Sequence, residues 1–431
     1  MLEHGGGIAI LPNGSLKRRN AATSYPFRFD SQFFYLTGFV EPDAWLAIIA
    51  KPNQAPSSWL FCRPKNPETE TWDGVLWGPE AARDAFGLEH ALAVDRLDQW
   101  MAEHLGASKA IFAPLHGCAI DNLPNKLQGW TQAARTKARG MATVPDRWFD
   151  LSVPLSHHRL IKDENELKLM RESASIAAQA HCTAMRTVKP GLSERALEAE
   201  LLAVFLRQGA QAEAYETIVA TGTNACTLHH AAGHTLIGQN DLVLIDAGCE
   251  LHGYASDITR TFPASGRFTE AQAALYDIVL AAQAAAVDET RPGLTFNAGH
   301  EAAVRVLSQG LIDEGLLAGS VDEVIETGSY REFYMHRTGH WLGLDVHDVG
   351  PYRLLEQDAD EPDWRVLSPG MVLTIEPGLY IRPSESVPEH FWGIGIRIED
   401  DAVVTTSGCE LITREVPVDR DDIEALVQSQ V

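Results

Sequence analysis

Acidic and histidine side chains in the second half of the chain have the types and the spacing that bind metal ions. Five positions carry this pattern, in the order Asp246, Asp257, His340, Glu376 and Glu399. Four carboxylates and one imidazole supply enough negative oxygens to neutralise two dications, and they allow two carboxylates to bridge both metals. This set is typical of a two-metal hydrolase.

Three of the acids follow apolar runs that predict buried strands. The runs are residues 242–245 before Asp246, 372–375 before Glu376 and 394–398 before Glu399. A single acid at the end of a strand is often only the start of a turn. Because burying an unpaired carboxylate is costly, three such acids together favour a shared cation.

Asp257 and His340 complete the set. Asp257 lies eleven residues after Asp246, which predicts a hairpin with its turn region at 248–253 and the two acids on facing strands. His340 alone is more often a structural histidine, but Gly339 and Gly343 beside it allow close approach of the backbone to a ligand.

Longer stretches around these residues resemble the pita-bread metallopeptidases, which include methionine aminopeptidase, prolidase, creatinase and aminopeptidase P. The similarity to the aminopeptidase P branch is the greatest. It is carried by residues 246–250, 253–263 and 340–348, and in the first half of the chain by 25–28 and 34–39. Motifs of this length are far more specific than a short pattern.

The resemblance implies a fold of two domains. The first is a mixed α/β, creatinase-like domain over residues 1–155. The second is a catalytic pita-bread domain over residues 156–431, built from duplicated helix-strand halves with the metal ligands on strands between them.

The resemblance also implies a role for each ligand. Asp246 would bind one metal, His340 and Glu376 the other, and Asp257 and Glu399 would bridge. Glu376 is placed to take the proton from the attacking water, which the two metals would activate as hydroxide. The all-oxygen set with one imidazole favours Mn²⁺ and tolerates Co²⁺ or Zn²⁺.

Further residues match family positions near the substrate. His229 and His347 match histidines at the cleaved bond, and His336 matches one that binds the residue after it. Arg397 lies two residues before Glu399 and is expected to orient a carboxylate ligand. The other matches are Tyr215, Tyr380 and Trp72. Each histidine has a structural alternative, and a core tryptophan is an equal alternative for Trp72.

The activity implied is release of the N-terminal residue from peptides with proline in the second position. Family members place the first domain over a neighbour's site, so a homodimer or homotetramer is expected. A position occupied by an acid in a close relative is Gln32 here, which leaves these cross-subunit contacts open. The alternatives are an Xaa-Pro dipeptidase (prolidase) and, ranked low because all five ligands are present, a non-catalytic peptide-binding protein.

The composition of the chain indicates which classes of partner it is not expected to bind. The 431 residues carry a formal net charge of −24, and such acidity repels nucleic acid and anionic lipid, so neither is expected to bind. Residues 1–7 do not resemble a signal peptide, and no run of about 18 apolar residues predicts a membrane span. Six cysteines without Cys-x-x-Cys spacing predict reduced thiols in a cytoplasmic protein.

Local patterns predict several elements. Strands are expected at 45–50 and 110–113, helices at 78–86 and 97–105, and a boundary at 139–154. A long helix is expected to follow Asp163, with Glu166 completing its cap, and a second helix to span 193–209. Residues 189–193 and 291–295 repeat a Pro-Gly-Leu-Ser/Thr pattern before a helix. This repeat fits a duplicated fold, although capping chemistry alone produces similar patterns.

Overall fold

The computed structural model describes residues 1–116, 120, 122–138, 144–355 and 362–429. The chain forms two compact units, Met1–Ser156 and His157–Val431. Part of the expected boundary, residues 139–143, lies outside the described residues, and residues 147–150 within it form a strand of the first unit.

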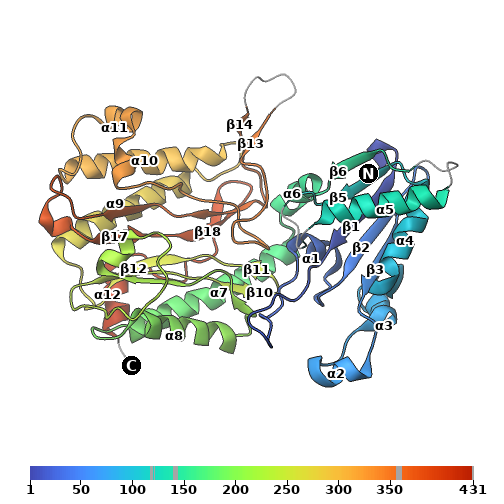
Figure 1. Cartoon of the computed structure of the whole chain (residues 1–431). Coiled ribbons are helices and arrows are strands. Elements are labelled where there is room, and N and C mark those ends of the chain that lie inside the picture. Colours follow the sequence, from blue (N-terminus) through green and yellow to red (C-terminus); the bar gives the residue numbers. More distant parts are fainter. Residues whose placement is uncertain (117–119, 121, 139–143, 356–361, 430–431) are drawn as a thin grey trace. The chain divides into compact units, whose positions relative to one another are not determined.

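The first unit is built on one six-stranded mixed sheet (Figure 1). The strand order is β4-β3-β2-β1-β5-β6, with antiparallel pairing from β1 to β3 and parallel pairing elsewhere. The strands are β1 (Gly7–Pro12), β2 (Trp45–Ala50), β3 (Ser57–Cys62), β4 (His90–Ala93), β5 (Ala110–Ala113) and β6 (Arg147–Asp150).

Helices cover both faces of this sheet because the side chains along its strands alternate between two apolar clusters. Ile8 and Ile10 pack with α4 and α5, whereas Ala9 and Leu11 pack with α1, α3 and α6. The helices are α1 (Ser31–Thr37), α2 (Pro67–Asp73), α3 (Gly78–Ala85), α4 (Leu97–His104), α5 (Leu123–Ala138) and α6 (Ser152–Leu160).

The second unit places short antiparallel strands between two helix pairs, α7 with α8 and α9 with α10 (Figure 1). Its helices are α7 (Glu164–Thr187), α8 (Glu194–Arg207), α9 (Glu270–Asp288), α10 (Phe296–Asp313), α11 (Val321–Thr327) and α12 (Arg420–Gln428). Asp163 and Glu166 form the expected capping box at the start of α7.

The strands of this unit form several small sheets, of which β12-β9-β8, β15-β18-β19 and β16-β17 bear on the site. Their bounds are β8 (Ile218–Thr221), β9 (Leu242–Asp246), β12 (Thr259–Pro263), β15 (Val372–Ile375), β16 (Gly378–Ile381), β17 (Ile394–Arg397), β18 (Asp400–Val404) and β19 (Cys409–Leu411). The remaining strands are β7 (Ala212–Glu213), β10 (Cys249–Leu251), β11 (Tyr254–Ala255), β13 (Arg353–Leu354) and β14 (Asp363–Trp364).

The repeated Pro-Gly-Leu-Ser/Thr pattern is confirmed as a structural duplication. Gly191 and Gly293 have positive φ angles of 89° and 88°, and Ser193 and Thr295 are the N-caps of α8 and α10. The two glycine N–H groups donate to corresponding carbonyls, those of Ile237 and Leu367. Shared capping residues would not produce the same long-range hydrogen bonds, so the two halves have the same local architecture.

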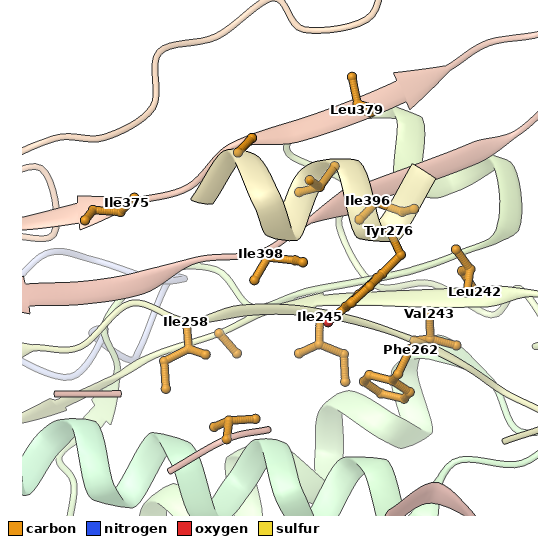
Figure 2. Packing of buried hydrophobic residues seen from close by; sticks show 14 of the residues in the cluster. Leu242, Val243, Ile245, Ile258, Phe262, Tyr276, Ile375, Leu379, Ile396 and Ile398 are labelled. Carbon is orange, nitrogen blue, oxygen red and sulfur yellow. The ribbon is translucent and has the colours of Figure 1, made fainter. Parts of the chain in front are cut away.

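Apolar side chains from both halves meet between the strands and helices (Figure 2). Ile245 on β9, Ile396 on β17 and Tyr276 on α9 belong to this cluster and are fully buried. At about 25 cal/mol per Å² of apolar surface, such burial supplies the main force that holds the strands in place. The ends of these strands are therefore firmly positioned.

Two further expectations concern membranes and thiols. Among the described residues, no helix is both long and apolar enough to cross a membrane. Five cysteines are unpaired, namely Cys62, Cys182, Cys226, Cys249 and Cys409, while Cys118 lies outside the described residues. Cys249 is buried against Ser173, as expected of a packing residue.

Candidate active site

The ends of paired strands bring the five expected ligands together. Asp246 ends β9, Glu376 follows β15, and Glu399 lies between β17 and β18. Asp257 lies two residues before β12, where Thr259 pairs with Asp246, so β9 and β12 are antiparallel partners but Asp257 is not itself on the facing strand. The expected turn region is wrong, because its residues 249–251 form β10, which pairs with β11.

His340 is positioned by a segment that runs beside β15. Its carbonyl accepts from Thr374 N at 2.9 Å, and its N–H donates to the Thr374 hydroxyl at 3.1 Å. A Cβ on Gly339 would lie 2.0 Å from the Thr374 carbonyl oxygen. Glycine is therefore required here for close packing against the strand, and Gly339 also lines the cavity of the site.

Short distances define the centre of the site. Donor atoms of Asp257, His340 and Glu399 all lie within 4.8 Å of one another. His340 Nε2 lies 3.4 Å from Asp257 Oδ2 and 3.9 Å from Glu376 Oε1. Oxygen atoms grouped around one imidazole nitrogen at this range suit hard divalent cations.

The pKa values of these acids show that their charged forms are unfavourable without a cation. Burial raises the pKa of Glu376 to about 7, although His340 and Arg397 oppose the change. Burial also raises the pKa of Glu399 well above its usual range, and the charges of Asp257 and Glu376 add to it. Nearby dications would reverse these shifts, because they favour the charged carboxylates.

The pKa of His340 also indicates an excess of negative charge in the site. Burial lowers its pKa, but the hydrogen bond to Asp257 and the charge of Glu376 outweigh burial and raise the pKa to about 9. The acids thus draw a proton onto this imidazole. A metal ligand must be a neutral imidazole, so a bound cation would take the place of that proton. The donor set fits divalent metal ions.

Arg397 orients the acids through two routes. Its Nη2 donates to Asp246 Oδ2 at 2.6 Å. Its Nε donates to the Thr259 hydroxyl at 3.0 Å, which in turn donates to Glu399 Oε2 at 2.6 Å. The guanidinium therefore holds one ligand directly and another through a threonine.

Tyr215 connects two of the acids. Its hydroxyl lies 2.6 Å from Asp246 Oδ1 and 2.5 Å from Asp257 Oδ1, so one proton is shared between two carboxylates. Burial, followed by the charges of Asp246 and Asp257, raises the pKa of Tyr215 well above its usual range. The phenol therefore stays protonated and holds the two carboxylates close together.

His336 and Tyr380 form a second chain of hydrogen bonds. Arg397 Nη1 donates to the Tyr380 hydroxyl at 2.9 Å, and that hydroxyl lies 2.8 Å from His336 Nε2. His336 Nδ1 donates to the Arg337 carbonyl oxygen at 2.7 Å. Burial and the charge of Arg397 lower the pKa of His336 to about 4, so the imidazole is neutral.

The loop that carries His229 is organised by the buried side chain of Glu194 at the start of α8. Glu194 Oε1 accepts from Thr221 N and Asn224 Nδ2, both at 2.9 Å. Its Oε2 accepts from His230 Nε2 at 3.0 Å and Gly233 N at 3.1 Å. Residues 221–233 are thereby tied to one carboxylate.

One cavity of about 1040 Å³ contains this site. All five expected metal ligands line it, together with His229, His336, His347, Arg397 and Tyr215. Tyr380 does not line it but hydrogen-bonds to His336 and Arg397, which do. The volume is large enough for a peptide of a few residues.

Trp72 lies in the first unit, on α2, and its side chain is 85% exposed. Val75 and Trp77 close to it are also exposed. The alternative of a core tryptophan is therefore wrong.

Asp30, two residues before Gln32, caps α1 by accepting from Phe33 N at 2.9 Å. This hydrogen bond gives Asp30 a structural role within the first unit.

Comparison with known proteins agrees with this geometry. Residues 168–406 match the model of metallopeptidase family M24, and residues 1–112 match the aminopeptidase P N-terminal domain. The chain belongs to metallopeptidase family M24. It is an enzyme of the hydrolase class that depends on divalent metal.

Curated M24 relatives match almost the whole chain. An Xaa-Pro aminopeptidase of Escherichia coli is 41% identical over 98% of this chain and 94% of its own length. One of Haemophilus influenzae is 40% identical over 95% of this chain and 91% of its own.

Solved M24 structures confirm the fold expected from the resemblance. Aminopeptidase PepP of Pseudomonas aeruginosa superposes with a TM-score of 0.94 at 46% identity, covering 98% of this chain and 94% of that one. A substrate complex of an E. coli aminopeptidase P variant gives a TM-score of 0.93 at 39% identity, covering 98% and 94%.

Sequence reasoning missed three residues that hold this M24 site together. Thr259 relays Arg397 to Glu399, Glu194 holds the His229 loop, and Asp401 accepts from Asp257 N at 3.1 Å. Thr259 and Asp401 each stand within two residues of an expected ligand, which was the available signal. No such sequence signal pointed to Glu194, because its hydrogen-bond partners lie 27 to 39 residues away.

Proposed function

We propose that this chain removes the N-terminal residue from peptides that have proline in the second position. The observation that carries the proposal is the convergence of five metal-ligand side chains and three histidines in one peptide-sized cavity. The near full-length similarity to Xaa-Pro aminopeptidases supports the same reaction.

The proposed cofactor is a pair of divalent cations, preferably Mn²⁺. Asp246 would hold one, His340 and Glu376 the other, and Asp257 and Glu399 both. When bound, the pair supplies Lewis acidity that makes hydroxide available near neutral pH. The absence of thiolate among the donors favours Mn²⁺, and tolerance of zinc is supported by a zinc-substituted E. coli aminopeptidase P solved with product.

The side chains of this chain then have distinct tasks. Glu376 accepts the proton of the attacking water. His229 and His347, both on the cavity wall, stabilise the negative charge that develops on the carbonyl oxygen of the cleaved bond. His336, neutral and held by Tyr380, lies against the residue that follows that bond.

Proline in the second position explains the need for such a site. Its nitrogen carries no hydrogen, so a peptidase that binds its substrate as an added strand loses a hydrogen bond there. An apolar wall for the proline ring and an acidic anchor for the free amine supply binding of another kind. The carboxylates of this site provide the anchor.

The remaining assignments concern assembly and location. We propose a homodimer or homotetramer in which Trp72 of one subunit reaches a neighbour's cavity, a use that fits its exposure. We place the enzyme in the cytoplasm, where the unpaired cysteines of the described residues would stay reduced.

The deciding experiment supplies Arg-Pro-Pro and Ala-Pro separately, each with Mn²⁺, and identifies the products by mass spectrometry. The expected result is free arginine from the tripeptide. Cleavage of Ala-Pro alone would reassign the enzyme as a dipeptidase. No cleavage of either peptide would contradict the proposal.

A further inference from the structure

A buried cluster of opposite charges lies beside the loop that follows His340 and carries His347. Arg159 Nη2 donates to Asp348 Oδ1 at 2.5 Å, and Lys162 Nζ donates to Asp348 Oδ2 at 3.0 Å. All three side chains are only 1–2% exposed. Arg159 also donates to Asp345, whose side chain is 41% exposed. We call Arg159, Lys162 and Asp348 the aspartate clamp.

The clamp closes a short loop, residues 341–348. Asp348 N donates to the Trp341 carbonyl at 2.8 Å, and Gly343 N donates to the Asp345 carbonyl at 3.1 Å. A Cβ on Gly343 would lie 2.2 Å from Asp348 Oδ2, so the clamp packs directly on the backbone of this loop. The loop begins just after His340 and ends at Asp348, just after the cavity histidine His347.

His347 depends on this loop for its place. Among the described residues, no hydrogen bond is formed by its imidazole. Its ring contacts that of His340, with the centroids 4.0 Å apart and the planes tilted by 34°. The backbone that holds it is fixed at the next residue, Asp348. The clamp at this neighbour therefore restrains the backbone of His347.

The clamp is an expensive way to obtain stability alone. The free energy needed to remove three charges from water often exceeds the electrostatic attraction that they gain in the interior. Apolar residues of similar size often stabilise a protein equally well. Arg159 Nε is also buried without a hydrogen-bond partner in the described part of the chain. Directional bonds to both carboxylate oxygens do provide what apolar packing lacks, which is a fixed orientation of the loop.

We propose that Asp348, held by Arg159 and Lys162, is a positioning residue that sets the imidazole of His347 toward the cleaved bond. This inference rests on the role proposed above for His347. Asp348 does not line the cavity, so it acts through its neighbour rather than on the substrate.

The test uses the double variant Lys162→Met/Asp348→Asn in the full-length enzyme loaded with Mn²⁺. Removing one cation together with the anion keeps the buried charge balanced, whereas Asp348→Asn alone would leave two cations facing an amide. We expect kcat for Arg-Pro-Pro to fall by about 10-fold to 100-fold, with little change in KM. Leu307→Ala, in the core of α10 and away from the cavity, is the control for lost stability.

A double-mutant cycle separates positioning from a general structural effect. In a His347→Ala background, the clamp variant should cause no further loss of kcat. An equal loss in both backgrounds, or an unchanged kcat in the clamp variant, would overturn the inference.

A second readout does not require turnover. In metal-free protein labelled with ¹³C at histidine Cε1, the His347 signal should shift or broaden in the clamp variant and stay in place in Leu307→Ala. An unmoved signal in the clamp variant contradicts the inference even where neither peptide is cleaved. Failure of wild-type cleavage with a moved signal contradicts only the proposed reaction.

Discussion

The residues of the site have properties that make sense only with a cation present. Asp246, Asp257, Glu376 and Glu399 line one cavity, and the Arg397 guanidinium hydrogen-bonds to one of them, Asp246. The raised pKa values of Glu376 and Glu399 and the raised pKa of His340 all relieve the same excess of negative charge. Function at this scale depends on charge balance.

Glu376→Ala tests the proton acceptor. We expect kcat to fall by at least about 100-fold, the usual contribution of a general base, while the circular dichroism spectrum stays unchanged. Exposed Glu385 provides a matched control, since Glu385→Ala removes the same group on the surface. Full activity of purified Glu376→Ala would refute the assignment.

His181 predicts a dependence of stability on pH. It is fully buried, its Nε2 lies 3.0 Å from the Ala247 carbonyl, and its Nδ1 has no hydrogen-bond partner in the part of the chain that the structure describes. Burial lowers its pKa from 6.5 to about 4. Below pH 6.5 the unfolded chain binds a proton that the folded chain does not, and stability falls until about pH 4.

The loss from this one group between pH 7 and pH 5 is about 2 kcal/mol, at about 1.4 kcal/mol per pKa unit. Urea unfolding at the two pH values, with wild type beside His181→Gln, measures it. The variant should lose less stability on acidification. Equal losses in both proteins would show that His181 does not titrate in this way.

At the scale of elements, the site is a property of strand ends and of the loops packed on them. Each half of the second unit contributes a strand with an acid at its end, Asp246 as the last residue of β9 and Glu376 directly after β15. The loops differ in how they are held. A buried carboxylate on a helix start holds residues 221–233, and the aspartate clamp holds residues 341–348.

Glu194→Gln tests the first of these anchors. Glu194 accepts hydrogen bonds from Thr221 N, Asn224, His230 and Gly233 N. Because an amide nitrogen cannot accept a hydrogen bond, the donors that face it in the variant lose their acceptor. We expect the free energy of unfolding to fall by about 2–3 kcal/mol. Because this loop carries His229, kcat should fall as well. Urea titration and peptide cleavage measure the two effects.

Glu198→Gln is the control, since Glu198 lies one turn further along α8 and its side chain pairs only with Arg195 among the described residues. It should retain wild-type kcat. Equal effects of the two substitutions would show that the acceptor position of Glu194 is not special.

At the scale of the whole molecule, the residues that we propose to be catalytic all belong to the second unit. The first unit contributes a sheet covered on both faces and an exposed apolar group at Trp72, Val75 and Trp77. Exposed side chains of this kind commonly mark a protein-protein contact. The first unit is therefore expected to act through assembly.

Trp72→Ala tests this expectation. If Trp72 reaches a neighbour's cavity, the substitution should raise KM for Arg-Pro-Pro while the free energy of unfolding stays within about 0.5 kcal/mol, since the side chain is exposed. Sedimentation at several concentrations would report the oligomer. Trp148→Ala, also in the first unit and 39% exposed, is the control. Identical kinetics for wild type and Trp72→Ala would refute the role.

Metal dependence is also a property of the assembled fold, because the ligands come from residues 246 to 399. Treatment with a strong chelator should abolish peptide cleavage and lower the melting temperature, and Mn²⁺ should restore both. Elemental analysis of the restored protein should find two metal ions per chain. Undiminished cleavage after chelation would rule out the metal site.

The sequence by itself determined which residues are candidate ligands, the apolar strands that precede three of them and the duplicated helix starts. These features are local: an apolar run followed by an acid, or a glycine before a capping residue, has its meaning within a few positions. The long motifs added the family, because many residue types agreed at fixed spacings.

Only the tertiary structure decided how the site is held. Thr259 relays Arg397 to Glu399, Glu194 gathers a loop, and the aspartate clamp fixes another across 186 to 189 residues of sequence. The close packing of Gly339 on Thr374 and of Gly343 on Asp348 is likewise visible only in the structure. Such contacts join positions whose separation is set by the whole fold, and for that reason no local pattern predicts them.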